Sequence, residues 1–180
     1  MHTLKTEAIV LKRRNVGEAD RLLTVLTKTH GKMQVKAPGV RKIASRRSPH
    51  IELLNRVTLN LYVRSVAPII TEAQMIADYQ FIKQDLVKVG YAYHLCEITD
   101  GLCAENQENA AVFYLLVKTL DDLCLSNTND AMSIIKNYEF QLLELLGFAV
   151  SRMRNQEFFN MHVYIESLLE KKLKSKDIFL

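Results

Sequence analysis

Residues 56–64 read Arg56-Val57-Thr58-Leu59-Asn60-Leu61-Tyr62-Val63-Arg64. Aliphatic and polar side chains alternate along this stretch, and in an extended chain successive side chains point to opposite faces. The pattern predicts a β-strand with one buried aliphatic face and one solvent-exposed polar face. The rest of the fold can be worked out from this strand.

Four more stretches in the first 77 residues carry strand signals. Residues 32–37 alternate in the same way, and shorter apolar runs occupy residues 8–12, 22–27 and 69–77. Turn-like triplets between them end in Gly17 and Gly31, and glycine adopts a positive φ without steric cost. Several short strands joined by tight turns predict a small β-barrel rather than a βαβ sheet.

The periodicity changes at about Asp78. Apolar residues then recur at helical spacing, and polar stretches at residues 105–108 and 126–130 interrupt them. The three apolar stripes are Tyr91, Leu95, Ile98 and Leu102; Val112, Leu116, Leu120 and Leu123; and Ile135, Tyr138, Leu142 and Leu146. Gly147 is a plausible cap for the third helix, and a last amphipathic segment spans residues 156–172. We predict an α+β protein with a barrel domain over residues 1–78 and an all-α domain over residues 79–180.

Charge divides the chain at nearly the same place. Residues 1–70 contain 14 Lys and Arg against 4 Asp and Glu, a net charge of +10. Residues 71–180 contain 10 against 16, a net charge of −6. This asymmetry predicts a polyanionic partner for the first part and a different role for the second.

Composition narrows the class of protein further. A hydrophobic fraction of 48% is typical of a globular protein. The chain has no apolar run of the length that a signal peptide or a membrane span requires. Its three cysteines are odd in number and all lie in the acidic part, which argues against a disulfide framework. We expect a cytoplasmic protein that binds no membrane.

The cations of the basic part gather on predicted strands and on the connection at residues 38–49, which holds four cations and no acid. The candidate DNA-binding residues are Lys12, Arg13, Arg14, Lys32, Lys36, Arg41, Lys42, Arg46, Arg47, Arg56 and Arg64. Lys32 and Lys36 are expected to share the polar face of one strand. The alternative is a solvated face that only aids solubility, but such faces usually mix both signs. Binding to phosphates is therefore the favoured interpretation.

Aromatic residues are scarce in this basic part, where Tyr62 is the only one before Tyr79. Sequence-tolerant binders of single strands usually stack bases on several aromatic rings. We therefore expect contacts mainly with the phosphate backbone. Affinity should then fall steeply with salt, and duplex DNA should be tolerated as well as single strands.

No catalytic residue, cofactor or metal site is predicted. The six glycines are scattered, so no phosphate-binding loop is formed. Cys96 and Cys103 lie seven residues apart without a histidine cluster, which favours small core residues over metal ligands. His30 and His50 have no partner at a recognisable triad spacing. A metal-dependent nuclease is the weakest hypothesis, because its carboxylate cluster is missing.

Several segments, taken in order, match the pattern of a known family. In the first part they are Glu7-Ala8-Ile9-Val10-Leu11, Gly17-Glu18-Ala19-Asp20-Arg21, Thr27 with His30-Gly31, and Ala37-Pro38-Gly39-Val40-Arg41. In the second part they are Asn109 with Val112-Phe113, Tyr138 to Phe148, and Leu173-Lys174-Ser175-Lys176. With these segments the chain resembles RecO, the bacterial recombination mediator of DNA repair, over nearly its whole length.

The resemblance implies an N-terminal OB-fold followed by a helical domain. It also implies binding to single- and double-stranded DNA, annealing of complementary strands, and loading of RecA onto SSB-coated DNA together with RecR. In the family the acidic C-terminal tail of SSB docks on the helical domain, near a basic residue that matches Lys136 here. Lys118 and Lys136 are the only cations between Gly90 and Ser151, so both are candidates for the tail, although a plainly exposed lysine is the common alternative.

Two departures from the family pattern stand out. Pro38 occupies a position where the family usually has a lysine. The segment that follows the Leu-Gly-Tyr-like motif in members, often with four zinc-binding cysteines, is missing here, so the chain resembles a short form and zinc is not expected. A second hypothesis for the function is a protein-only adaptor, whose basic barrel binds an acidic protein.

Overall fold

The structure is a computed structural model that describes residues 2–63, 67–148 and 160–175. It divides into two compact units. The barrel unit comprises Met1–Asp78 and Ala104–Phe113, and the helical unit comprises Tyr79–Cys103 and Tyr114–Leu180. The short segment at residues 104–113, which the predicted division placed in the all-α domain, belongs to the barrel unit.

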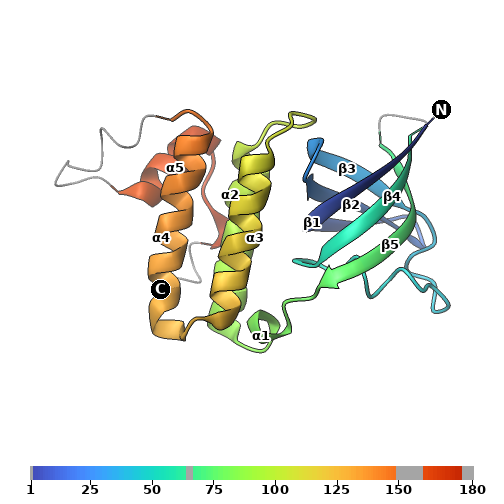
Figure 1. Ribbon diagram of the computed structural model, residues 1–180, viewed down its shortest axis with the longest axis horizontal. Coiled ribbons are helices and arrows are strands. Elements are labelled where there is room, and N and C mark those ends of the chain that lie inside the picture. The colour runs from blue at the N-terminus through green and yellow to red at the C-terminus, as the bar shows by residue number, and fades with distance from the viewer. Residues whose placement is uncertain (1, 64–66, 149–159, 176–180) are drawn as a thin grey trace. The chain divides into compact units, whose positions relative to one another are not determined.

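The barrel unit contains five strands: β1 (His2–Val16), β2 (Asp20–Thr27), β3 (Gly31–Ala37), β4 (Arg56–Val63) and β5 (Ile69–Ala77). They close in the order β1-β2-β3-β5-β4, with β3 and β5 parallel and every other pair antiparallel (Figure 1). This is the five-stranded Greek-key barrel of an OB-fold. The predicted α+β class and the predicted OB-fold are confirmed.

Strand β1 closes the barrel because it is long enough to pair on both sides. Its first half, His2–Ile9, pairs with β4, and its second half, Ala8–Val16, pairs with β2. The register shifts by one residue between Val10 and Lys12, which is a β-bulge. Bulges bend a strand and increase its twist, so β1 can pass from one side of the barrel to the other.

The barrel interior holds the aliphatic residues that the alternation predicted, except Val63 at the end of β4, which is half-buried. They include Leu59 and Leu61 of β4, both fully buried. Val40 and Ile51, from the connection between β3 and β4, join the same interior cluster. The connection is therefore fastened to the barrel by two buried side chains, although it contains only turns and bends.

The segment at residues 104–113 packs closely on the start of β3. The backbone N–H of Asn106 donates to the carbonyl of Lys32 at 2.7 Å. Gly31 has a φ of +66°, and a Cβ at this position would lie 1.8 Å from the carbonyl oxygen of Gln107. Only glycine satisfies both the backbone angle and the close approach.

The helical unit contains α1 (Gln80–Lys83), α2 (Leu86–Leu102), most of α3 (Ala110–Leu125), α4 (Thr128–Leu145) and α5 (Met161–Leu169). The predicted stripes are buried in α2, α3 and α4, except for two last members: Leu102 at the end of α2 and Leu146, the residue after α4, are half-buried. Helices α2 and α4 pack against each other (Figure 1). None of the helices in the described ranges combines the length and apolar character that a membrane crossing requires.

Helix α4 ends at Leu145, and Gly147 takes part in its C-terminal cap, as predicted. The N–H of Gly147 donates to the carbonyl of Glu144 at 3.1 Å, and the N–H of Phe148 donates to the carbonyl of Leu143 at 2.9 Å. With a φ of +87° at Gly147, this is a Schellman motif. Helix α4 begins at Thr128, inside the predicted polar break. Its N-cap residue, Asn127, makes no side-chain cap hydrogen bond among the described residues, but Asp130 in the first turn suits the positive end of the helix dipole.

Helix α5 is shorter than the predicted segment. It runs from Met161 to Leu169, and the predicted residues 156–159 lie outside the described part. Its N-cap is Asn160, whose side-chain oxygen accepts from the N–H of Val163 at 3.3 Å.

Candidate nucleic-acid interface

Exposed cations line one end of the outer face of β1, β2 and β3. The strand register places Arg14 opposite Leu22, and Leu22 opposite Lys36, so the two cations flank one row of the sheet. Lys12 lies in the next row on the same face, opposite Thr24. All three cations are exposed.

The connection between β3 and β4 brings three more exposed cations to this end of the barrel. The N–H of Arg41 donates to the carbonyl of Ala19 at 2.9 Å, and its Nη1 donates to that of Gly17 at 3.1 Å. The start of the connection therefore lies beside the β1–β2 turn. We define the basic face as six exposed cations: Lys12, Arg14, Lys36, Arg41, Lys42 and Arg46.

Arg13 and Arg21 are close to the basic face but share a carboxylate, Glu52. Nη1 of Arg21 lies 2.8 Å from Oε1 of Glu52, and Arg13 contacts Oε2. Partial burial lowers the pKa of Arg21, and the positive charges of Arg13 and Arg41 lower it further. Arg13 and Arg41 thus lie near Arg21, and Glu52 forms ion pairs with Arg13 and Arg21. Sequence reasoning missed Arg21, although it is the second residue of β2 and is paired with Ala37, next to the connection.

Two other predicted DNA-binding residues have internal partners. The guanidinium of Arg47 donates to the carbonyl of Pro38 at 2.7 Å and to that of Ile70. Arg56 forms an ion pair with Glu7 across β4 and β1. Both arginines are half-buried, and we leave them out of the basic face.

Lys32 lies on the same outer face of β3 as Lys36, as expected, but it is only 8% exposed and therefore does not belong to the basic face. It ends a row in which Ile9, Leu26 and Lys32 lie opposite one another on the outer face. The segment at residues 104–113 covers the start of β3, where Asn106 bonds the Lys32 carbonyl. The remaining candidate, Arg64, lies outside the described residues.

The basic face is formed without an aromatic side chain. Tyr62 is half-buried on β4, where it is paired with Thr3 of β1 and Ile69 of β5. It therefore lies on neither β2 nor β3. The chemistry that the basic face offers is charge-assisted hydrogen bonding to phosphate oxygens.

The two lysines predicted to bind the SSB tail lie in the helical unit. Lys118 is exposed on α3, one turn after Tyr114, which is 49% exposed. Lys136 is exposed on α4, where Phe140, one turn later, is half-buried. Each helix therefore presents a cation and an aromatic residue at a spacing of four, which places them on one side of the helix.

Comparison with known proteins identifies the family. The family model described as "Recombination protein O N terminal" matches residues 1–79, and the one described as "Recombination protein O C terminal" matches residues 83–154. The chain belongs to the RecO family. The predicted resemblance is confirmed, and the boundary between the two matches lies close to the end of β5.

Several proteins named DNA repair protein RecO are similar to this RecO-family chain. The one from Roseiflexus sp. (strain RS-1) is 37% identical over 145 residues, which are 80% of this chain and 50% of that protein. The one from Moorella thermoacetica is 36% identical over 145 residues, 81% and 53% of the two chains. The one from Dehalococcoides mccartyi (strain ATCC BAA-2266 / KCTC 15142 / 195) is 35% identical over 147 residues, 82% and 57%. The chain spans about half the length of these relatives.

Proposed function

We propose that this chain is a DNA-binding recombination mediator of DNA repair. The observation that carries the proposal is the basic face at the β1–β2 turn and on the β2–β3 side of an OB-fold, in a chain of the RecO family. Oligonucleotides bind OB-folds on this side of the barrel and on the adjoining loops. We propose that the protein acts in the cytoplasm, where bacterial DNA is repaired.

The proposed mechanism needs no catalytic group. Six exposed cations bind phosphates of single- or double-stranded DNA and leave the base edges free. Screening the charge of two strands at once reduces their repulsion, so complementary bases can pair. The protein thus anneals strands by electrostatics alone, without turnover and without a cofactor.

For the helical unit we propose a protein-binding role. Lys136, with Lys118, pairs with the acidic C-terminal tail of SSB, and the neighbouring aromatic residues contact its apolar end. Recruitment to SSB-coated strands, together with RecR, then allows loading of RecA. The net negative charge of residues 71–180 supports this division, because acidic residues repel DNA from the helical unit.

Strand annealing tests the proposal. Complementary oligonucleotides coated with bacterial SSB are mixed with the wild-type chain, and duplex formation is followed by fluorescence. Lys36→Glu removes a cation of the basic face, whereas Lys5→Glu makes the same charge change on the same strand as Arg14, roughly 20 Å along β1 from Lys12. Lys36→Glu should slow annealing several-fold, and Lys5→Glu should leave it nearly unchanged.

The protein-only adaptor predicts a different outcome. It requires negligible affinity for bare DNA at low salt and equal behaviour of the two variants. Either result would exclude the DNA-binding proposal and leave the basic face as a site for an acidic protein.

Lys136→Glu tests the second surface. We expect it to weaken binding of an SSB-tail peptide by about tenfold or more, since reversing one charge replaces attraction by repulsion. Affinity for bare DNA should stay nearly the same. Lys172→Glu, an exposed position of the helical unit, is the matched control. Equal loss of peptide and DNA binding in Lys136→Glu would contradict two separate surfaces.

A further inference from the structure

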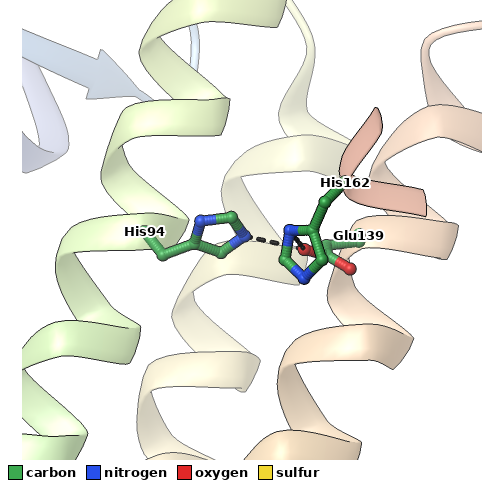
Figure 2. A group of neighbouring side chains, drawn as sticks. All are labelled: His94, Glu139 and His162. Carbon is green, nitrogen blue, oxygen red and sulfur yellow. Dashed lines mark hydrogen bonds and ion pairs between the residues drawn. The ribbon is translucent and has the colours of Figure 1, made fainter. Parts of the chain in front are cut away.

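Three potential metal ligands converge inside the helical unit. His94 comes from α2, Glu139 from α4 and His162 from α5, and their side chains point toward one another (Figure 2). One ligand atom from each residue lies within 4.8 Å of the other two. His94 and Glu139 are fully buried, and the His162 side chain is 31% exposed.

The carboxylate of Glu139 is only half satisfied. Its Oε1 lies 2.7 Å from Nε2 of His94 and 3.5 Å from Nδ1 of His162. Its Oε2 is buried and has no hydrogen-bond partner among the residues that the structure describes. A charged oxygen buried without a partner is costly, and a bound cation is one way to remove that cost.

The hydrogen bonds around His94 orient its ring for ligation. The hydroxyl of Ser175 donates to Oε2 of Glu97 at 2.8 Å, because a carboxylate only accepts. The Ser175 oxygen, 2.8 Å from Nδ1 of His94, is then the acceptor for the Nδ1 proton. With Nδ1 protonated, Nε2 faces Glu139 with either a second proton or a cation between them. Metal-bound histidines are typically held in this way, by a hydrogen bond from the other ring nitrogen.

We propose that His94, Glu139 and His162 bind one divalent transition-metal ion, with zinc as the best match to the donor set. Two imidazole nitrogens and one carboxylate oxygen are a common set of three protein ligands for zinc, with a fourth position left for water. The exposed side of His162 provides access for that water. On binding, the ion takes the place of the proton between His94 and Glu139, and that proton leaves to solvent. Glu139 turns its free Oε2 to the ion.

This ion joins α2, α4 and α5, so it stabilises the helical unit. It also strengthens the hold on residues 173–175, because Ser175 bonds to the ligand His94. The expectation of no metal rested on the spacing of the cysteines, on the lack of histidine or carboxylate clusters in the sequence, and on the missing zinc-binding insert; it did not consider residues that only the fold brings together. Cys96 and Cys103 are buried, and neither takes part in the cluster of His94, Glu139 and His162.

Metal content and thermal unfolding of the full chain test the proposal. The protein is stripped with a chelator, and Zn²⁺ is then titrated by calorimetry, with bound metal measured after dialysis. We expect one zinc ion per chain and a higher unfolding temperature with zinc. Co²⁺ in place of zinc should give visible absorption bands from a site with nitrogen and oxygen ligands.

Four variants identify the site. His162→Gln alters the partly exposed ligand and should fold, and Glu139→Gln removes the carboxylate charge but keeps its shape. Each should lose zinc binding, and Ser175→Ala should weaken it by roughly 10–100-fold, as for other groups that hold a ligand histidine in place. Cys124→Ser, which removes the half-buried thiol, should bind zinc as the wild type does.

Two outcomes would overturn the proposal. One is a wild-type chain that binds no zinc and unfolds at the same temperature with zinc and with chelator, which would leave the cluster as a hydrogen-bonded ion pair. The other is undiminished zinc binding in folded His162→Gln, checked by circular dichroism.

Discussion

Glu52 reduces the positive charge next to the basic face, because its carboxylate forms ion pairs with both Arg13 and Arg21. Arg41 lies close enough to Arg21 for its positive charge to lower the pKa of Arg21. A single carboxylate therefore neutralises part of a three-arginine cluster next to the basic face. Replacing Glu52 therefore tests the electrostatic binding of DNA through an expected gain in affinity, whereas replacing a cation tests it through a loss.

Glu52→Gln should tighten binding to single-stranded DNA by up to about fivefold at low salt. The reason is that two arginines lose a competing anion, and an exposed charge pair contributes ~1 kcal/mol at most. Fluorescence anisotropy with a labelled oligonucleotide measures the change, with thermal unfolding as a check on folding. A weaker affinity in a folded variant would contradict a role for this cluster.

Gly31 illustrates a residue whose role is steric. Gly31→Ala should destabilise the protein by roughly 2–5 kcal/mol, since an L-residue at positive φ costs about 1–2 kcal/mol and overpacking adds about 1–3 kcal/mol. The structure offers a matched control in Gly17, which has a φ of +56° but no atom within 4 Å of the position that a Cβ would take. Gly17→Ala should cost only the backbone part, about 1–2 kcal/mol. Equal losses in chemical denaturation would mean that the segment at residues 104–113 does not pack on β3.

Among the elements, α2 begins at a side-chain cap that depends on pH. Oδ1 of Asp85 accepts from the N–H groups of Val87 and Lys88 at 2.9 and 3.2 Å, and Oδ2 accepts from the hydroxyl of Thr128 at 3.0 Å. The hydrogen bond from the Lys88 N–H is the main cause that lowers the pKa of Asp85 in the folded protein. The cap joins the starts of α2 and α4.

Because the folded pKa of Asp85 is depressed, its stabilisation is present above the unfolded value, about 3.9. It is lost as the pH falls through the lower, folded value. Asp85→Asn keeps a good N-cap but cannot titrate, so its unfolding midpoint should fall less than that of the wild type between pH 6 and the acid range. Asp121→Asn, which removes an exposed acid of α3, is the control. Parallel pH profiles of wild type and Asp85→Asn would refute the role of the cap.

The spacing of apolar residues along the sequence was enough to predict most strands and helices. Alternation at residues 56–64 and apolar spacing of three and four found the strands and the long helices, because each buries one face. The full length of β1 was not predicted, because only residues 8–12 form an apolar run; residues 2–7 and 13–16 are mostly polar or charged. Helix α1 was not predicted, because a helix of four residues is too short to show a repeating pattern of apolar residues.

Contacts between segments that are distant in the sequence could not be predicted from the spacing of apolar residues. The burial of Lys32 depends on residues 104–113, more than 70 positions away in the sequence. The cluster of His94, Glu139 and His162 likewise joins three helices that no spacing rule connects. Of the basic candidates, the exposed ones could be predicted from strand faces, whereas the internal roles of Arg47 and Arg56 depend on tertiary partners.

At the scale of the whole molecule, the charge of the chain is divided between two compact units with different chemistry. The barrel unit carries the basic face, and two of its acids, Glu7 and Glu52, form ion pairs with arginines. The helical unit carries the exposed lysines Lys118 and Lys136, which are separated from other cations in the sequence, on an acidic background. This division agrees with the proposed mediator role, in which DNA and the protein that coats it are bound by separate surfaces.

The most direct test of the central claim is the salt dependence of DNA affinity. The dissociation constant for a labelled single strand is measured across a series of NaCl concentrations, for the wild type, Lys36→Ala and Lys5→Ala. Phosphate binding predicts that log affinity falls with log salt by about 0.7 for each phosphate neutralised, so that Lys36→Ala lowers the slope by nearly that amount and Lys5→Ala leaves it unchanged. A flat salt dependence, or the same slope in all three proteins, would contradict binding of phosphates by the basic face.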